Sequence, residues 1–546
     1  MDDGEQSLVG LVAMGSELLR AGRYPEACDA LTTAISSGAD DVVVWVRLAQ
    51  AINGIPAFNS PNEAVREWLL RLAQYPGISQ ALLHGPITRY LFTGRSFAEL
   101  WVRAGAPGLV VAEADLETLA DPLLIALLHR GSPLTLEIER LATGARRLLI
   151  ASDLDAPELR CALAASAIAS EFAWAETPEE TARIEALGAQ LAGAGDADPK
   201  AVATYAAYRP LHLAPWASGL AHRNWPAPFD DLIRLALIEP LEEQEIARTI
   251  PRFGAIAGEV SKAVQAQYEQ NPYPRWLSLA RPPADPLPET IKRGHPLADL
   301  SGLQWPARPQ ILIAGCGTGR QAIEVALRHP AGEVLALDLS RSSLAYGKRK
   351  AMEMGVQNLQ FGQADLMDVD LGDRRFDLIE SVGVLHHLER PREGWRRLVD
   401  MLRPGGLMTI ALYSRAARAW LADLRQRYGV RDDAQGIRDF RQQLMVAEPR
   451  HAILSTIDFY SLSDCRDLVF HVQETQFSLD EIAQILPGLG LRFLGFSMPY
   501  AQLDAYDARF PDDPARTSLA HWAELEAEQP GLFLGMYHFW AIKTGQ

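Results

Sequence analysis

Three glycines in five residues, Gly315-Cys316-Gly317-Thr318-Gly319, are the strongest chemical signal in this chain. The apolar run Ile311–Ala314 before them predicts a buried strand, and the pattern over residues 320–328 predicts a helix. A strand, a glycine turn and a helix in this order bring backbone N–H groups and the positive end of the helix beside a bound ligand. The run therefore predicts a nucleotide-type site, although a glycine-rich turn alone is also compatible with a tight connection and no ligand.

A second strand, Glu333–Asp338, ends in an acid about twenty residues after the glycines. A carboxylate at this place can accept two hydrogen bonds from a ribose diol, and the alternative is a solvated acid in a turn. Strands and helices continue to alternate, which predicts a mostly parallel sheet covered by helices. The expected elements are a helix over 342–354, strands over 359–366 and 376–380, a helix over 393–402 and a strand over 407–413.

The segments GCGTG (315–319), VLHHL (384–388) and LRPGG (402–406), together with Asp338 and the pair Ala364-Asp365, resemble the class I S-adenosylmethionine-dependent methyltransferases. The resemblance covers residues 295–415 well. It implies a Rossmann-like α/β sheet, the cofactor S-adenosyl-L-methionine and methyl transfer. It also implies contacts of the glycine backbone with the cofactor, of Asp338 with the ribose, of Asp365 with the adenine amino group and of two leucines with the ring. The cofactor-binding residues that it implies are Gly315, Cys316, Gly317, Gly319, Asp338, Leu339, Asp365, Leu366, Ser381 and Val382.

One position departs from the pattern of this family. Many members carry an acid two residues before the first glycine, where this chain has Ile313. The amino group of the cofactor must then find another partner, such as the Ala314 carbonyl or a side chain from outside the core.

Composition limits the remaining function classes. The chain has 546 residues, 48% of them hydrophobic, and a formal net charge of −17. This charge disfavours a nucleic-acid substrate, because phosphate contacts need a basic surface. The four cysteines are far apart and have no metal-ligand spacing, so we expect free thiols and no metal site. Without a predicted leader or membrane span, we expect a cytoplasmic protein that does not enter the membrane.

The N-terminal half is expected to be all α-helical. Over residues 8–41, Gly15, Tyr24 and Ala27 stand at the spacing of a tetratricopeptide (TPR) repeat, and a degenerate second copy follows. Such repeats bury their faces against neighbours and commonly hold a protein or peptide. A helical bundle with a chance match is the alternative. Further helices are expected over 115–129, 134–150, 158–173 and 178–192.

The whole arrangement resembles the bacterial fusions of TPR repeats to a methyltransferase. This resemblance rests on the motifs above and on two further segments, NPYPRW (271–276) and DFYSLSDCRDLVFHVQE (458–474). We expect TPR-like repeats over 1–75, a helical region over 76–250, a linker with the NPYPRW joint over 251–294, the cofactor-binding core over 295–415, a helical insertion or lid over 416–487, and the last two core strands over 488–546.

Methyl transfer from a sulfonium is an in-line displacement in which the enzyme mainly aligns the reacting atoms. A base is needed only when the acceptor arrives protonated, and imidazoles suit this role near neutral pH. The catalytic candidates are His386, His387, Tyr460, His471 and Glu380; the substrate-contact candidates are Tyr268, Asn271, Tyr273, Arg275, Asp458 and Glu474.

Several acceptors remain open. The first hypothesis is a side chain of a protein or peptide recruited by the helical half. The second is a small molecule, with the helical half forming a homodimer or binding a carrier. Glu380 and Glu389 flank a short loop and resemble the paired glutamates of protein arginine methyltransferases, which is a further alternative. The last alternative is not an enzyme but a repeat scaffold whose methyltransferase-like domain binds the cofactor without turnover.

Overall fold

The computed structural model describes residues 3–132, 134–193, 197–282, 284–429 and 431–544. The chain divides into two compact units. Unit 1 comprises residues 1–242, 275–281 and 431–468, and unit 2 comprises 243–274, 282–430 and 469–546. The segment predicted as one lid, 416–487, is thus shared between the two units.

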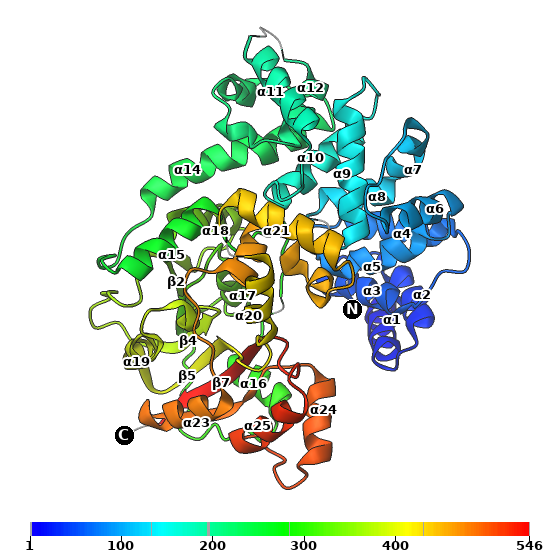
Figure 1. The fold of residues 1–546 in the computed structure, drawn as a ribbon. Coiled ribbons are helices and arrows are strands. Elements are labelled where there is room, and N and C mark those ends of the chain that lie inside the picture. Colours follow the sequence, from blue (N-terminus) through cyan, green and yellow to red (C-terminus); the bar gives the residue numbers. More distant parts are fainter. Residues whose placement is uncertain (1–2, 133, 194–196, 283, 430, 545–546) are drawn as a thin grey trace. The chain divides into compact units, whose positions relative to one another are not determined.

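The described part of unit 1 is built of helices (Figure 1). Helices α1 and α2 pack closely, since a Cβ added to Gly15 would lie only 2.7 Å from the Leu31 side chain. The expected all-helical N-terminal half is therefore present, while its assignment to TPR repeats stays a prediction. The helices are α1 (Asp3–Arg20), α2 (Tyr24–Ser36), α3 (Val42–Gly54), α4 (Glu63–Gln74), α5 (Gln80–Leu91), α6 (Arg95–Ala104), α7 (Leu116–Leu119), α8 (Pro122–His129), α9 (Leu136–Ile150), α10 (Pro157–Ala169), α11 (Pro178–Gly193), α12 (Pro199–Ala206), α13 (Phe229–Ile233), α21 (Ala434–Ala447) and α22 (Leu462–Cys465).

The prediction of a single helix over 115–129 is wrong, because the structure has two helices there, α7 and α8. Asp121 caps α8, where its side chain accepts a hydrogen bond of 2.8 Å from the Leu123 N–H. Pro122 then occupies the first position of the helix, which suits a proline but does not continue a preceding one. The sequence pair Asp-Pro carried this signal.

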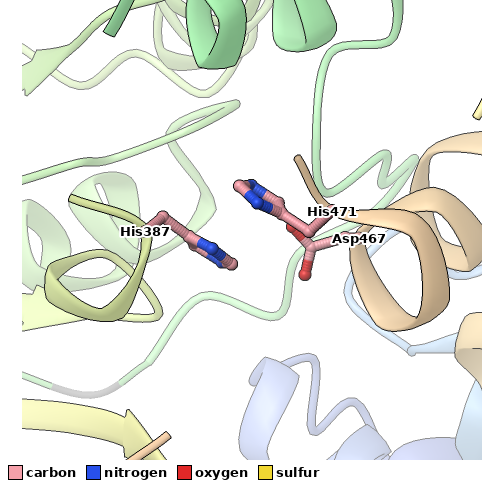
Figure 2. Close-up of side chains that lie close together, drawn as sticks. All are labelled: His387, Asp467 and His471. Atoms are coloured by element: carbon pink, nitrogen blue, oxygen red, sulfur yellow. The ribbon is translucent and has the colours of Figure 1, made fainter. Parts of the chain in front are cut away.

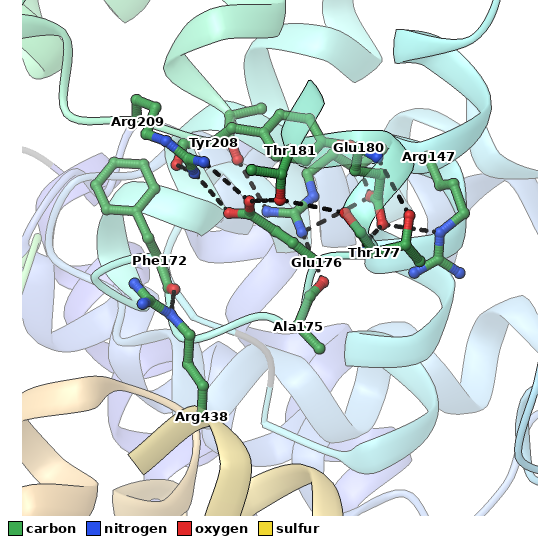
Figure 3. Close-up of polar contacts among 12 residues, drawn as sticks. Arg147, Phe172, Ala175, Glu176, Thr177, Glu180, Thr181, Tyr208, Arg209 and Arg438 are labelled. Carbon is green, nitrogen blue, oxygen red and sulfur yellow. Dashed lines mark hydrogen bonds and ion pairs between the residues drawn. The ribbon is translucent and has the colours of Figure 1, made fainter. Parts of the chain in front are cut away.

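Buried ion pairs and hydrogen bonds connect the helices of unit 1. Glu180 of α11 accepts hydrogen bonds from the Tyr208 hydroxyl (2.8 Å) and from Arg147 of α9 (3.0 Å) (Figure 3). The later segment 431–468 is attached in the same way, since Arg438 of α21 donates to the Phe172 carbonyl at 2.8 Å. Arg441 of α21 forms a buried ion pair with Glu139 of α9.

Unit 2 contains a seven-stranded sheet of order β3-β2-β1-β4-β5-β7-β6, in which β7 alone runs antiparallel to its neighbours. The predicted α/β fold of the class I methyltransferase type is confirmed. Its strands are β1 (Gln310–Ala314), β2 (Glu333–Asp338), β3 (Leu359–Gln363), β4 (Phe376–Val382), β5 (Leu402–Tyr413), β6 (Leu491–Phe496) and β7 (Met536–Lys543), and its helices are α14 (Glu239–Thr249, which begins in unit 1), α15 (Glu259–Gln270), α16 (Leu287–Gly294), α17 (Arg320–Arg328), α18 (Arg341–Glu353), α19 (Pro391–Met401), α20 (Trp420–Tyr428), α23 (Leu479–Gly488), α24 (Tyr500–Arg509) and α25 (Leu519–Glu528).

The LRPGG segment, predicted as a turn before the fifth strand, lies inside β5. Leu402 pairs with Phe376 and Leu407 with Leu378, so residues 403–406 leave the ladder as a bulge. Pro404 has no N–H to donate to the ladder, and Gly405 has a positive φ of 72°. Both residues fit a bulge as well as they fit a turn.

Candidate functional site

The glycine turn lies at the carboxyl end of β1, where parallel α/β sheets bind ligands. Gly315, Gly317 and Gly319 all have positive φ values, which side chains rarely tolerate. At Gly317 space is excluded as well, because an added Cβ would lie 2.3 Å from the Tyr273 carbonyl oxygen. The NPYPRW segment also fixes the turn, because the N–H of Thr318 donates a hydrogen bond of 3.1 Å to the Tyr273 carbonyl.

Asp338 ends β2 and faces the glycine turn. Its two carboxylate oxygens accept hydrogen bonds from the N–H of Gly317 (2.7 Å) and of Ser340 (2.9 Å). Desolvation raises the pKa of Asp338, against the opposing effect of these two hydrogen bonds. Each oxygen keeps a further lone pair, so the fixed carboxylate can still accept from a diol.

Asp365 and Ser381 each carry a buried polar atom that is not satisfied. Asp365 is 1% exposed; its Oδ1 accepts from the Met367 N–H at 2.9 Å, whereas Oδ2 has no hydrogen-bond partner among the described residues. The hydroxyl of Ser381, fully buried at the end of β4, is likewise unpaired within the described chain. Buried polar atoms normally have partners, so two exceptions beside one glycine turn indicate a place for a polar ligand.

An acid on β4, the neighbour of β1 in the sheet, stands beside the β1 position at which many members of the family carry their acid. Glu380 of β4 is the register partner of Ile313 in the parallel pair β1–β4. The side chain of Gln321 on α17 donates a hydrogen bond to the Glu380 carboxylate. Burial raises the pKa of Glu380 to about 7, against the effects of that hydrogen bond and of the charge of Arg328. Gln321 was not foreseen from the sequence, since a glutamine on a helix has no distinctive spacing.

The remaining predicted cofactor residues lie around the same turn. Cys316 is buried and its N–H donates to the Leu337 carbonyl at 2.9 Å. The Leu339 carbonyl accepts from the Gln363 side chain at 2.9 Å, and Leu366 is buried after β3. Val382 is the last residue of β4. The structure thus brings the predicted set to one edge of the sheet, while the contact of each residue with a cofactor stays a prediction.

The first histidine of the VLHHL loop is packed into the core of unit 2. His386 is fully buried, stacks on the Tyr413 ring at 3.9 Å, and its Nδ1 accepts from the Tyr413 N–H at 3.3 Å. Burial holds the pKa of His386 well below its usual range, with further lowering by His387, His471 and Arg418. This ring is therefore neutral at pH 7.

Two other predicted imidazoles lie face to face (Figure 2). The rings of His387 and His471 are 3.5 Å apart at an angle of 21°. His387 Nδ1 donates to the Gln473 carbonyl at 2.7 Å, and His471 Nε2 lies 3.1 Å from the Tyr268 hydroxyl. These contacts join the VLHHL loop, the segment after α22 and the end of α15, so three predicted residues from distant positions form one cluster.

The other candidates occupy different surroundings. Glu474 forms a buried bidentate ion pair with Arg418, at 2.7 and 3.0 Å. Burial raises the pKa of Glu474, but the hydrogen bonds and charge of Arg418 outweigh it and hold the value below its ordinary range. Tyr273 stacks near Tyr268 at 6.1 Å, and Asn271 ends α15. Glu389 is exposed, unlike Glu380.

Three candidates belong to unit 1. Tyr460 is buried there and its hydroxyl donates to the Leu454 carbonyl at 2.7 Å. Asp458 lies in the short helical turn Ile457–Phe459, and Arg275 begins the stretch 275–281 that belongs to unit 1. The joint NPYPRW is thus where the chain passes from one unit to the other.

Comparison with known proteins agrees with this geometry. Residues 311–406 match the family model described as a methyltransferase domain. The matched stretch begins in β1 and ends in β5, and it contains the glycine turn, Asp338 and Asp365. An uncharacterised protein of Synechococcus sp. is 30% identical over 274 residues, which are 45% of this chain and 62% of that protein.

Named methyltransferases match the domain over shorter stretches. A trans-aconitate 2-methyltransferase of Deinococcus radiodurans is 38% identical over 120 residues, 22% of this chain and 43% of that protein. A ubiquinone/menaquinone biosynthesis C-methyltransferase of Azotobacter vinelandii is 27% identical over 140 residues, 25% of this chain and 50% of that protein. The chain spans about half the length of these curated relatives. No described helix is both long and apolar enough to cross a membrane.

Proposed function

We propose that the chain is an S-adenosylmethionine-dependent methyltransferase that acts on a side chain of a protein or peptide, recruited by TPR-like repeats of the helical half. The observation that carries the proposal is the matched methyltransferase domain, in which the glycine turn, Asp338 and the open acceptor of Asp365 lie at the carboxyl edge of the sheet. When bound, the cofactor supplies the methyl group on a sulfonium sulfur.

The residues of the site suit each part of that cofactor. Asp338 is oriented by two backbone N–H groups and can accept from the ribose hydroxyls. Asp365 offers an unpaired carboxylate oxygen to the adenine amino group. Glu380 could take the place of the acid that is absent at position 313, since it stands in register on the neighbouring strand and forms no ion pair with a described lysine or arginine, although the charge of Arg328 lowers its pKa. A buried carboxylate without an ion-pair partner is a favourable partner for an ammonium group.

The charges of the site also favour a cationic ligand over a nicotinamide dinucleotide. Asp338, Asp365 and Glu380 gather around the turn, and none of them forms an ion pair with a described lysine or arginine. A pyrophosphate would be repelled by this arrangement, whereas a sulfonium with an α-ammonium group would be attracted. Alignment of the acceptor with the methyl group then supplies most of the catalysis.

A small-molecule acceptor is the second candidate, because the named relatives above act on trans-aconitate and in quinone biosynthesis. The paired-glutamate arginine grip is less favoured, because Glu380 is buried against Gln321 while Glu389 is exposed. A scaffold without turnover is disfavoured by the intact glycines, Asp338 and Asp365.

Two measurements test the proposal. S-adenosylhomocysteine should raise the melting temperature of the full chain, as any ligand specific for the folded state does; no shift with it or with S-adenosylmethionine would remove the cofactor assignment. Incubation with methyl-labelled cofactor and a cell lysate should then label macromolecules. Label confined to the small-molecule fraction would favour the second candidate.

A further inference from the structure

Helix α8 forms the floor of a groove within unit 1. Residues 122, 125, 126 and 129 of α8 share one face, whereas its leucines at 123, 124, 127 and 128 are buried on the other. Leu70 of α4 and Leu159 of α10 also line the space beside α8. This space, here called the α8 groove, has a volume of about 980 Å³. An apolar concave surface of this size is large enough for several side chains of a partner.

The rim of the α8 groove is acidic. Glu117, Asp155, Glu158 and Asp231 line it and are exposed. Asp155 pairs with Lys200 at 2.5 Å, but no ion pair joins the other three to a described lysine or arginine. The cation in the lining, Arg130, is directed inward and donates to the carbonyls of Ala73 and Ile78. Three carboxylates therefore face solvent beside an apolar floor, and none of them is paired with a described lysine or arginine.

We infer that the α8 groove binds an amphipathic, lysine- or arginine-rich peptide segment. Its apolar side chains would lie on the α8 floor, and its basic side chains would meet the carboxylates of Glu117, Glu158 and Asp231. Charge complementarity selects this partner, since acidic peptides and nucleic acids would be repelled by the same rim. The inference rests on the proposed function only in taking the partner to be the protein substrate; the binding itself needs no methyl transfer.

The direct test is binding of a fluorescent cationic amphipathic helix-forming peptide to the full chain, followed by fluorescence anisotropy. Glu117→Gln/Glu158→Gln/Asp231→Asn should weaken binding at least about tenfold, and higher salt should weaken it further. The matched control is Glu17→Gln/Glu179→Gln/Glu185→Gln, three exposed carboxylates of unit 1 outside the groove, which should bind as wild type. Melting temperatures of both triple variants establish that they fold.

Four results would overturn the inference. The first is equal peptide binding by the groove variant and wild type. The second and third are binding of a peptide with glutamine in place of lysine that equals that of the cationic peptide, and tighter binding of a peptide with glutamate in place of lysine. The fourth is a dimer of the chain in light scattering that depends on the groove residues. The last result would make a second copy the occupant.

The two proposals fail separately. Cofactor binding by both triple variants should match wild type, because the substituted residues belong to unit 1. Peptide binding without any methylated macromolecule would leave the groove standing and refute the protein acceptor. Undiminished kcat/KM for a protein substrate in the groove variant would refute the groove as its docking site and keep the activity.

Discussion

Unit 1 and the glycine turn of unit 2 both contain buried acids, but two buried glutamates of unit 1 pair with arginines whereas the acids at the turn accept hydrogen bonds from neutral groups. Glu139 pairs with Arg441, and Glu180 with Arg147. Glu380 instead accepts from an amide, and Asp338 from backbone N–H groups. A buried acid that is paired with a cation costs the fold less than an uncompensated one, and an uncompensated acid marks a site that receives a positive ligand.

The largest effect is expected where a buried pair is broken. Arg441→Met should lower the free energy of unfolding by about 3–5 kcal/mol, because Glu139 would keep a buried charge without its partner. Urea unfolding measures this loss. Arg438→Met, which removes one hydrogen bond to the Phe172 carbonyl, should cost about 1 kcal/mol. Equal losses in the two variants would show that the ion pair has no special weight.

Removal of the ribose acceptor should come next. We expect Asp338→Ala to weaken binding of S-adenosylhomocysteine at least about 100-fold, or about 2.7 kcal/mol, because both diol hydrogen bonds are lost. Titration calorimetry measures the affinity, and exposed Asp373→Ala is the control that should retain it. If Asp338→Ala retained the affinity of wild type, the assignment of the ribose contact to Asp338 would be wrong.

Glu380→Gln should weaken cofactor binding about tenfold and remove a pH dependence. Since the pKa of Glu380 is raised to about 7, its carboxyl is largely protonated below pH 7 and ionises above it. An ammonium group binds the ionised form, so the affinity of wild type should rise from pH 6 to pH 8. A flat wild-type profile, or an equal slope in Glu380→Gln, would contradict the assignment.

Glu380 also makes the stability of the ligand-free chain depend on pH, with a sign opposite to that of the cofactor affinity. Its pKa in the folded, ligand-free chain exceeds the ordinary value of 4.5, so the folded state binds more protons between these two pH values. The stability that Glu380 contributes is therefore lost as the pH rises from about 4.5 through 7. Glu380→Gln should flatten this part of the pH–stability profile, which urea unfolding at several pH values can measure.

The smallest effect is expected at the adenine end. Asp365→Asn should weaken S-adenosylhomocysteine binding by about 1 kcal/mol, roughly fivefold, because the amide keeps the Met367 contact at one oxygen and offers a donor at the other. An analogue with a carbonyl in place of the adenine amino group is the matched probe. If wild type binds the two ligands equally, Asp365 does not contact the amino group.

Local patterns predicted much of unit 2. The apolar run before the glycines became β1, and the helix expected over 320–328 is α17 with the same bounds. The Asp121-Pro122 pair and the LRPGG bulge were misjudged, because periodicity does not distinguish a turn within a helix from a continuous one, nor a bulge from a strand end. The residues predicted to hold the cofactor lie at one edge of the sheet because they follow consecutive strands at regular spacing, and their contacts with it stay a prediction.

The sequence alone determined the glycine turn, Asp338 and the alternating strands and helices, since each depends on residues close along the chain. Only the tertiary structure decided that Glu380 stands beside Ile313, that His387 stacks on His471, and that Glu474 is committed to Arg418. These relations join residues from about 55 to 85 positions apart, and strand register and burial set them. Local periodicity indicates that a segment is buried but not which distant residue it meets, because that depends on how the segments pack.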